Sequence, residues 1–228
     1  KKDGKGNATN YTYDTYNLYP ATSTNALSHT NAYSYDYSSG KVKQLVDQNS
    51  RVYQNTYDGF DRILEVKQPD LTTPTTLVTK LQYTYTDNTV PVKIQETVSL
   101  SSATSTDKYT YFDGIGRKIQ ERVEAEGSNT YVVKDYVFGT STKLIKESLP
   151  YFASSTSWSS PTTTSNLFNN YIYDSIGRIV NASNAVGTTT NVYDDWHTTT
   201  IDPLGKSKDF YKDARGNLVT VVEHSSSV

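Results

Sequence analysis

Acidic and basic side chains stand four residues apart at several places in this 228-residue chain, a spacing that could serve chemistry. Two carboxylates held close together can act as general acid and general base on a glycosidic bond. The pairs that fit this role are Asp194 with Asp195, and Asp174 with Glu121. A catalytic pair is normally unique, however, whereas acids here recur at one position of a repeated pattern. We therefore expect no catalytic residues.

The repeated pattern is acid-x-x-Gly-basic, and its acids follow one another at intervals of ten or eleven residues. Three runs show the interval: Asp36, Asp47, Asp58; Asp113, Glu124, Asp135; and Asp174, Asn184, Asp194, where Asn184 takes the place of an acid. Asp202 and Asp213 follow, eleven residues apart. An Asp side chain can accept hydrogen bonds from backbone two residues on, and glycine supplies the positive φ that ends a tight turn. Asp61 and Ser50 replace the glycine in two copies, and Asp tolerates the left-handed conformation better than most residues. The residues assigned to this structural turn are Asp58, Asp113, Gly116, Arg117, Asp174, Gly177, Arg178, Asp202, Gly205, Asp213 and Gly216.

The base after each glycine has two interpretations. Arg117, Arg178 and Lys206 could form a charged row that binds a ligand. Alternatively, each base pairs with acids on the adjacent turn and keeps the sheet edge from joining another sheet. We favour the second interpretation.

The segments between the turns are about six residues long, which is a usual strand length. Many contain Tyr-x-Tyr, and a period of two places both rings on one face of a strand. The chain has 20 Tyr but only 6 Phe and 2 Trp, and Tyr and Thr favour β-sheets. These features predict an all-β fold of repetitive antiparallel hairpins, with about 10–11 residues per half-unit. We assign residues 1–228 to one repeat region, a fragment of a longer chain.

The formal net charge is −2, so the chain lacks the excess of basic residues that is typical of nucleic-acid-binding proteins. No apolar run is long enough to span a membrane. Cysteine is absent, so disulfides and thiolate metal sites are excluded. His29, His197 and His224 are scattered and lack the close spacing of a zinc site. We expect no metal and no cofactor.

Two stretches near 64–107 and 139–170 are rich in Ser, Thr and Pro and interrupt the repeat. In the first stretch these pieces flank two possible strands, 80–86 and 92–100. We expect the Ser-, Thr- and Pro-rich pieces themselves to be long exposed hairpin loops or edge insertions. Trp158 lies in the second stretch and Trp196 follows two aspartates. Either ring could contact a sugar or a partner, or could anchor a loop against the sheet.

The pieces "YDGFDRI", "YFDGIGRKIQ", "YIYDSIGRIV" and "DPLGKSKDFYKDARGNLV" resemble the YD repeat of the Rhs family. This family includes bacterial Rhs toxins, the B and C components of Tc toxins, and the teneurins. The resemblance implies a broad antiparallel sheet that curves or spirals into a hollow β-shell, which in bacterial members encloses a C-terminal toxin. The family's protease core motif and a separate toxin domain are absent from this sequence, so those activities are not carried over.

We therefore expect a non-enzymatic wall segment of a secreted or surface-displayed shell. Its partners would be neighbouring repeats of the same chain and an encapsulated effector. The alternative is an adhesin-like or teneurin-like scaffold that binds a cell-surface or glycan partner through the long loops. A carbohydrate-active enzyme is a minor alternative.

Overall fold

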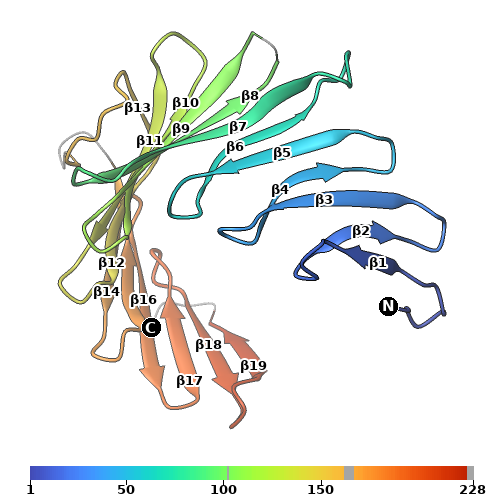
Figure 1. Ribbon diagram of the computed structural model, residues 1–228. Coiled ribbons are helices and arrows are strands. Elements are labelled where there is room, and N and C mark those ends of the chain that lie inside the picture. The colour runs from blue at the N-terminus through green and yellow to red at the C-terminus, as the bar shows by residue number, and fades with distance from the viewer. Residues whose placement is uncertain (102, 162–166, 225–228) are drawn as a thin grey trace. The chain divides into compact units, whose positions relative to one another are not determined.

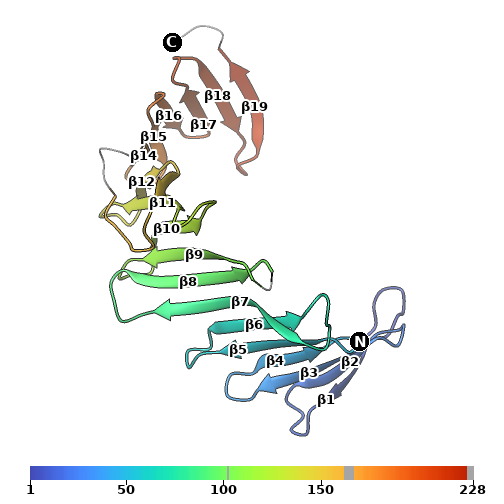
Figure 2. The ribbon, with the colours of Figure 1, turned by 90° about the horizontal axis from the view of Figure 1, so that it is seen from above.

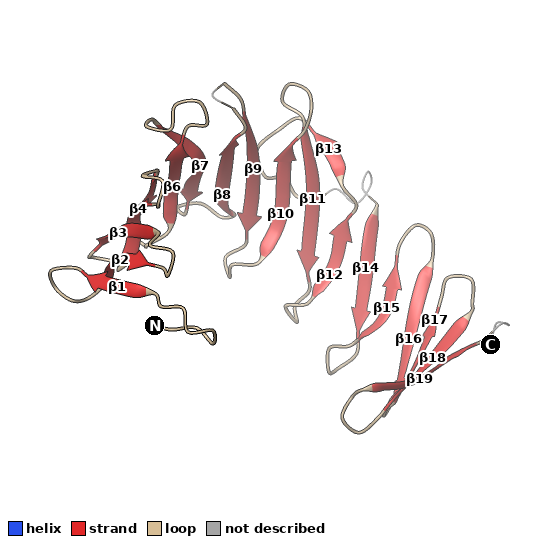
Figure 3. Ribbon diagram, turned by 90° about the vertical axis from the view of Figure 1, so that its right-hand side faces the viewer, coloured by secondary structure: helices blue, strands red, loops and turns tan. Residues whose placement is uncertain are grey.

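The computed structural model describes residues 1–101, 103–161 and 167–224, and these residues contain strands and no helix (Figure 3). No helix among them is long and apolar enough to cross a membrane. The strands are β1 Asn10–Tyr13, β2 Pro20–Thr24, β3 Thr30–Asp36, β4 Lys41–Val46, β5 Val52–Tyr57, β6 Ile63–Pro69, β7 Leu77–Thr86, β8 Val92–Ser99, β9 Ser105–Phe112, β10 Lys118–Glu124, β11 Tyr131–Phe138, β12 Leu144–Ser148, β13 Tyr151–Ala153, β14 Phe168–Tyr173, β15 Ile179–Ser183, β16 Thr188–Asp194, β17 His197–Ile201, β18 Ser207–Lys212 and β19 Leu218–Glu223. The all-β prediction is confirmed.

The chain divides into two compact units. The first comprises Lys1–Asp87 and Ile94–Tyr109, and the second comprises Asn88–Lys93 and Thr110–Val228. In the first unit, β1 to β7 follow one another side by side, and each pairs antiparallel with the next (Figure 1). Most of the strand residues in this part are half-buried, because the side chains of a single sheet layer are covered mainly by their neighbours.

The second unit repeats the arrangement with one irregularity. Strands β14 to β19 are successive antiparallel neighbours, and β16 to β19 lie side by side in Figure 2. After β12, however, the chain adds the short strand β13 beside the first half of β11. The next strand, β14, then pairs with β12 rather than with β13. Residues 154–161, which follow β13, belong to no strand.

The stretch 64–107 consists mainly of the strands β6, β7, β8 and β9. The possible strands at 80–86 and 92–100 correspond to parts of β7 and β8. Most of the Ser and Thr residues that indicated loops lie outside the strands, namely Thr72, Thr73, Thr75, Thr76, Ser101 and Thr104, whereas Thr79, Ser99, Ser105 and Thr106 lie within them. The connections between these strands are shorter than we expected, because β7 and β9 begin within the Ser- and Thr-rich pieces.

Candidate functional site

The recurring acid-x-x-Gly-basic segment, which we call the corner turn, has the same geometry in each well-formed copy. In residues 113–117, Asp113 Oδ1 accepts hydrogen bonds from the backbone N–H groups of Ile115 (3.0 Å) and Arg117 (2.9 Å). Gly116 has a φ of 83° and donates its backbone N–H to the Asp113 carbonyl (3.1 Å). The turn is a type I turn followed by a left-handed residue, which is a standard three-residue hairpin connection.

The other assigned turn residues occupy equivalent positions. Asp58, Asp174, Asp202 and Asp213 each accept two backbone N–H bonds within their own turns. The final turn residue has positive φ in Gly177 (89°), Gly205 (78°), Gly216 (83°), Asp61 (62°) and Ser50 (59°). The aspartates are therefore committed to holding backbone in place.

Hydrogen bonding also sets the charge state of these acids. The pKa of Asp174 is lowered, chiefly by the backbone N–H of Arg178; burial opposes this effect, and the guanidinium of the same residue lowers the pKa further. Asp174 consequently remains ionised at neutral pH, so it is poorly suited to act as a general acid.

The adjacent-turn pairing that we expected is present for Arg62, whose guanidinium lies 2.7 Å from Asp87 Oδ2, directly after β7, in addition to its bond with Asp58 in its own turn. Arg117 and Arg178 instead pair within their own turns. Arg117 Nε lies 2.7 Å from Asp113 Oδ2, and Arg178 Nε lies 2.7 Å from Asp174 Oδ2. Each guanidinium also lies over an aromatic ring at the end of a strand in the following hairpin. These stacks are Arg62 on Tyr85 (3.9 Å), Arg117 on Phe138 (4.6 Å) and Arg178 on Tyr193 (4.1 Å), measured to the ring centroid. Pairing and stacking together hold the guanidinium in one orientation.

A second tie joins five of the hairpins to the one before, through a tyrosine at or next to the end of a strand. Its hydroxyl donates to a backbone carbonyl at or near the start of a strand in the preceding hairpin. The five bonds are Tyr35 to Pro20 (3.0 Å), Tyr57 to Val42 (2.9 Å), Tyr85 to Ile63 (3.0 Å), Tyr173 to Leu144 (2.8 Å) and Tyr193 to Ile179 (2.9 Å). In the dipeptide Tyr-Asp, the tyrosine therefore binds the neighbouring hairpin and the aspartate closes its own turn.

The most buried polar side chains form a cluster in the second unit that sequence reasoning did not find. Arg122 is 1% exposed, while Gln120 and Asp135 are fully buried. Arg122 Nε donates to Gln120 Oε1 (2.8 Å), and Gln120 Nε2 donates to Asp135 Oδ1 (2.5 Å). Tyr151 donates its hydroxyl to the other oxygen of Asp135 (2.9 Å). Asp135 had seemed to be one more turn acid, because it stands eleven residues after Glu124, but it lies inside β11.

This cluster is covered by residues 151–161, which we call the strap. The guanidinium of Arg122 donates to the carbonyl of Ser155 (2.6 Å) and to the hydroxyl of Ser159 (3.0 Å). Tyr111 donates its hydroxyl to the carbonyl of Thr156. The part of the 139–170 stretch that we expected to be an exposed loop is thus bonded to the sheet, because a buried arginine needs acceptors that the β-ladder cannot supply.

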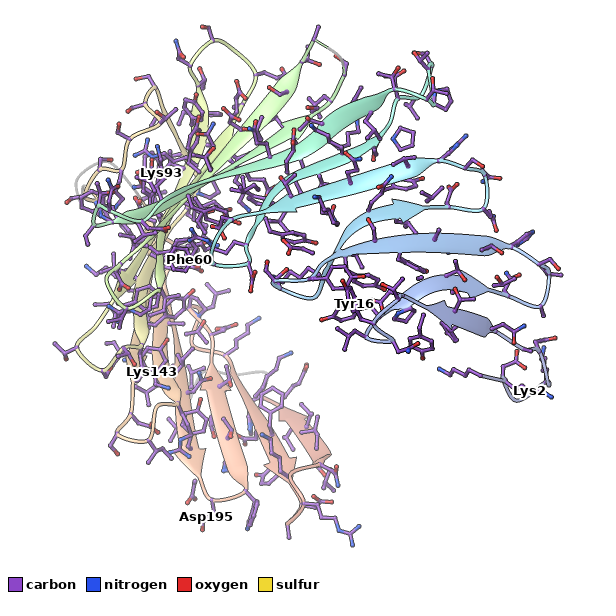
Figure 4. All side chains as sticks on the ribbon, in the orientation of Figure 1. Lys2, Tyr16, Phe60, Lys93, Lys143 and Asp195 are labelled. Carbon is purple, nitrogen blue, oxygen red and sulfur yellow. The ribbon has the colours of Figure 1, made fainter. Side chains whose placement is uncertain are left out.

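The four acids of the candidate catalytic pairs lie in different settings. The carboxylate of Asp174 is used by its own turn, and Glu121 pairs with Lys118 (3.2 Å). Asp194 ends β16, and Asp195 follows it in the tight turn to β17 with a φ of 46°. Lys143 and Asp195, both labelled in Figure 4, lie at the turn ends of their hairpins.

Two histidines that looked scattered in the sequence meet at one carboxylate. His197 Nε2 lies 3.1 Å from Asp209 Oδ1, and His224 Nε2 lies 2.8 Å from Asp209 Oδ2. His29 is elsewhere, in a turn where Asn25 Oδ1 accepts its backbone N–H (3.0 Å). Among the described residues, no group of three His, Cys, Asp or Glu side chains could hold a metal ion. The signal for this meeting was the register of β17, β18 and β19, which the sequence alone did not give.

The two tryptophans have different surroundings. Trp158 is 36% exposed and belongs to the strap, between the two serines that bind Arg122. Trp196 is 57% exposed at the tip of the β16–β17 hairpin. It lines an open cleft of about 630 Å³ together with Arg178, Tyr193, Asp194 and Asp195. Of the two rings, Trp196 is therefore the one offered to solvent beside charged groups.

No protein-family description and no curated protein matches the chain. Solved structures do match its fold. A chain of the crystal structure of TcdB2-TccC3-TEV gives a TM-score of 0.76 at 12% identity, and one of TcdB2-TccC3 without its hypervariable C-terminal region gives 0.73 at 11%. A chain of the Photorhabdus luminescens Tc holotoxin pore gives 0.75 at 12%. Each match covers 94% of this chain but only 16% of the other, so the likeness shows the fold of a segment.

Proposed function

We propose that the chain is a non-enzymatic wall segment of a YD/Rhs-repeat β-shell, secreted or displayed at the cell surface, that encloses a polypeptide cargo. The observation that supports this proposal most directly is the tyrosine tie, which joins one hairpin to the hairpin before it and recurs in both units. The fold shared with segments of TcdB2-TccC3 supports the same proposal. Under it, residues 1–228 are one repeat region, and its main partners are further repeats and the enclosed cargo.

The corner turns also support a wall role. A wall must continue from hairpin to hairpin without exposing flat edges that recruit other sheets. The carboxylates and guanidinium groups of three corner turns place charge at the ends of their strands. Of the acids that could have served catalysis, Asp174 holds a corner turn and Glu121 pairs with Lys118, so the proposal assigns them no reaction.

The test uses the full-length polypeptide in which this chain occurs. Electron microscopy of the purified protein is expected to show a hollow particle, and limited proteolysis is expected to leave an internal segment intact. Adding a denaturant just sufficient to open the particle should expose that segment to the protease. A protein that forms an open sheet, with all segments outside the sheet cleaved at the same rate, would overturn the proposal.

A second candidate is glycan binding, and the cleft at Trp196 favours it. An exposed indole can stack on the apolar face of a sugar, while carboxylates accept hydrogen bonds from its hydroxyls and a guanidinium donates to its ring and hydroxyl oxygens. The cleft provides all three groups. This role would be adhesin-like, although it uses a hairpin tip instead of the Ser/Thr-rich stretches.

Glycan binding is tested on an array of neutral and acidic glycans with Trp196→Ala, and with Trp158→Ala as the matched control. Loss of binding in the first variant alone would support the candidate. Equal binding by both variants, or no binding by the unmodified chain, would reject it. Release of reducing sugar from a bound glycan would instead revive the enzymatic alternative for Asp194 and Asp195.

A further inference from the structure

The last three strands of the described chain are joined by one carboxylate. Asp209 lies on β18, the middle strand of the three, and its side chain is 14% exposed. Its Oδ1 accepts the hydroxyl of Thr199 (2.7 Å) and contacts His197 Nε2, both on β17. Its Oδ2 contacts His224 Nε2 (2.8 Å), directly after β19. Three strands therefore share a single acid.

The two imidazoles approach the acid from opposite sides. Because β17 and β19 flank β18, each ring nitrogen takes a different carboxylate oxygen. This arrangement suits two proton-mediated contacts and not a shared metal ion, which needs its ligands to converge on one point. His197 is further positioned by a parallel stack on Tyr211, with centroids 4.6 Å apart and planes 11° apart.

Few other titratable groups face the cluster. Alternation along the strands places Asp194 of β16 and Tyr211 of β18 on the same side of the sheet as Asp209. Lys208 and Glu223 pair with each other on the opposite side (2.6 Å). The β19 residues on the cluster's side, Thr220 and Val222, carry no charge. The charge of the cluster is thus set mainly by Asp209 and the two imidazoles.

We propose that His197, Asp209 and His224 form a proton-operated clasp that holds β19 to the sheet more firmly in acidic than in neutral or alkaline medium. Imidazoles change charge between pH 5 and 8. A charged imidazolium makes a charge-assisted hydrogen bond to a carboxylate, and such bonds are roughly twice as strong as neutral ones. Protonation of the two rings therefore strengthens both contacts of Asp209 at once.

The carboxylate itself remains charged over this range. The pKa of Asp209 is lowered to about 2, first by the hydrogen bond from His224, then by that from Thr199, and also by His197. A carboxyl group with a depressed pKa contributes stability above its unfolded value of about 4, and loses it as the pH falls towards 2. The contribution of the carboxylate to the clasp is therefore fully present above about pH 4.

The clasp gives strands β17 to β19 a pH-dependent stability that the corner turns lack, because the partners of the turn acids are arginine and backbone groups that do not titrate near neutrality. The inference does not depend on a closed shell or on a cargo, since it concerns pairing within three strands.

The test is amide hydrogen exchange followed by NMR on the 228-residue chain, with each rate divided by the intrinsic rate at the same pH. From pH 5 to pH 8, the protection of β19 amides is expected to fall about tenfold, the factor that corresponds to about 1.4 kcal/mol. The amides of β15 and β16 serve as the internal reference and are expected to change less than twofold.

Variants separate the clasp from general instability. Asp209→Asn keeps the shape but should make the protection of β19 nearly independent of pH, at the low value. His224→Gln should do the same for β19, while the β17–β18 amides keep their pH dependence through His197. His29→Gln is the matched control and should behave as the unmodified chain. Protection of β19 that does not change with pH, or an unaltered pH dependence in Asp209→Asn, would overturn the clasp.

Discussion

Replacing Arg122 with methionine tests whether the strap is part of the fold or only covers it. Methionine retains much of the side-chain volume, so the change removes mainly the charge and the hydrogen bonds. Those bonds reach Gln120 Oε1, the Ser155 carbonyl and the Ser159 hydroxyl at 2.8, 2.6 and 3.0 Å. Gln120 then keeps a buried oxygen without this donor, and Asp135 stays buried beside it without the cation.

The expected loss follows from these contacts. Hydrogen bonds to a charged group contribute about 1.5–3 kcal/mol each, but the two serines can recover bonds to water once the strap lifts. Breaking a buried charged network by removing one member costs about 3–5 kcal/mol. At about 2–4 °C per kcal/mol for a chain of this size, Tm should fall by about 6–20 °C. The strap should also become a new site of protease cleavage.

The matched control is Arg178→Met. Its side chain is 44% exposed and pairs only with a turn acid and an aromatic ring, and exposed ion pairs contribute at most about 1 kcal/mol. Calorimetry measures the Tm of both variants, and limited proteolysis measures cleavage of their straps. If Arg122→Met melts within about 2 °C of Arg178→Met and its strap resists protease, the strap is not anchored by the buried arginine and our reasoning fails.

Three further outcomes follow from the corner turns, the tyrosine ties and the hydrogen bond from Tyr171 to Glu147. Gly177→Val should cost more than about 1 kcal/mol, because Gly177 has a φ of 89° that β-branched residues resist, while Gly114→Ala, at an open position without positive φ, should melt nearly unchanged. Tyr193→Phe should lower the free energy of unfolding by about 0.5–1.5 kcal/mol in urea titrations, since it removes one tie but keeps the ring. The pKa of Tyr171 is raised to about 12 by burial and by its bond to Glu147. A raised pKa contributes stability below the unfolded value near 10 that is lost as the pH rises to 12, and a difference absorbance titration against Tyr171→Phe should show this late ionisation.

The local structure could be predicted from the sequence because many copies of the repeat encode the same turn and strand pattern. Asp and Gly at fixed offsets encode a corner turn through bonds that span only four residues, and Tyr-x-Tyr encodes a strand face. The cluster around Arg122 escaped prediction, since its partners lie 33 and 37 residues away in a segment whose Ser and Thr content resembles a loop. The meeting of His197 with His224 escaped for the same reason, because it depends on strand register.

Both long-range features occur in the second unit and use side chains in ways that the repeat does not. The corner turns and tyrosine ties bind each hairpin only to itself and to its neighbour, so they give continuity without distinguishing one place in the wall from another. Arg122 commits a non-repetitive strap to one position on the sheet, and Asp209 makes strands β17 to β19 sensitive to pH. If the chain has properties beyond those of generic wall material, they should therefore respond to changes at Arg122, Asp209 and Trp196. Changes at a corner turn that does not line the Trp196 cleft, such as Arg117→Met, should alter stability alone.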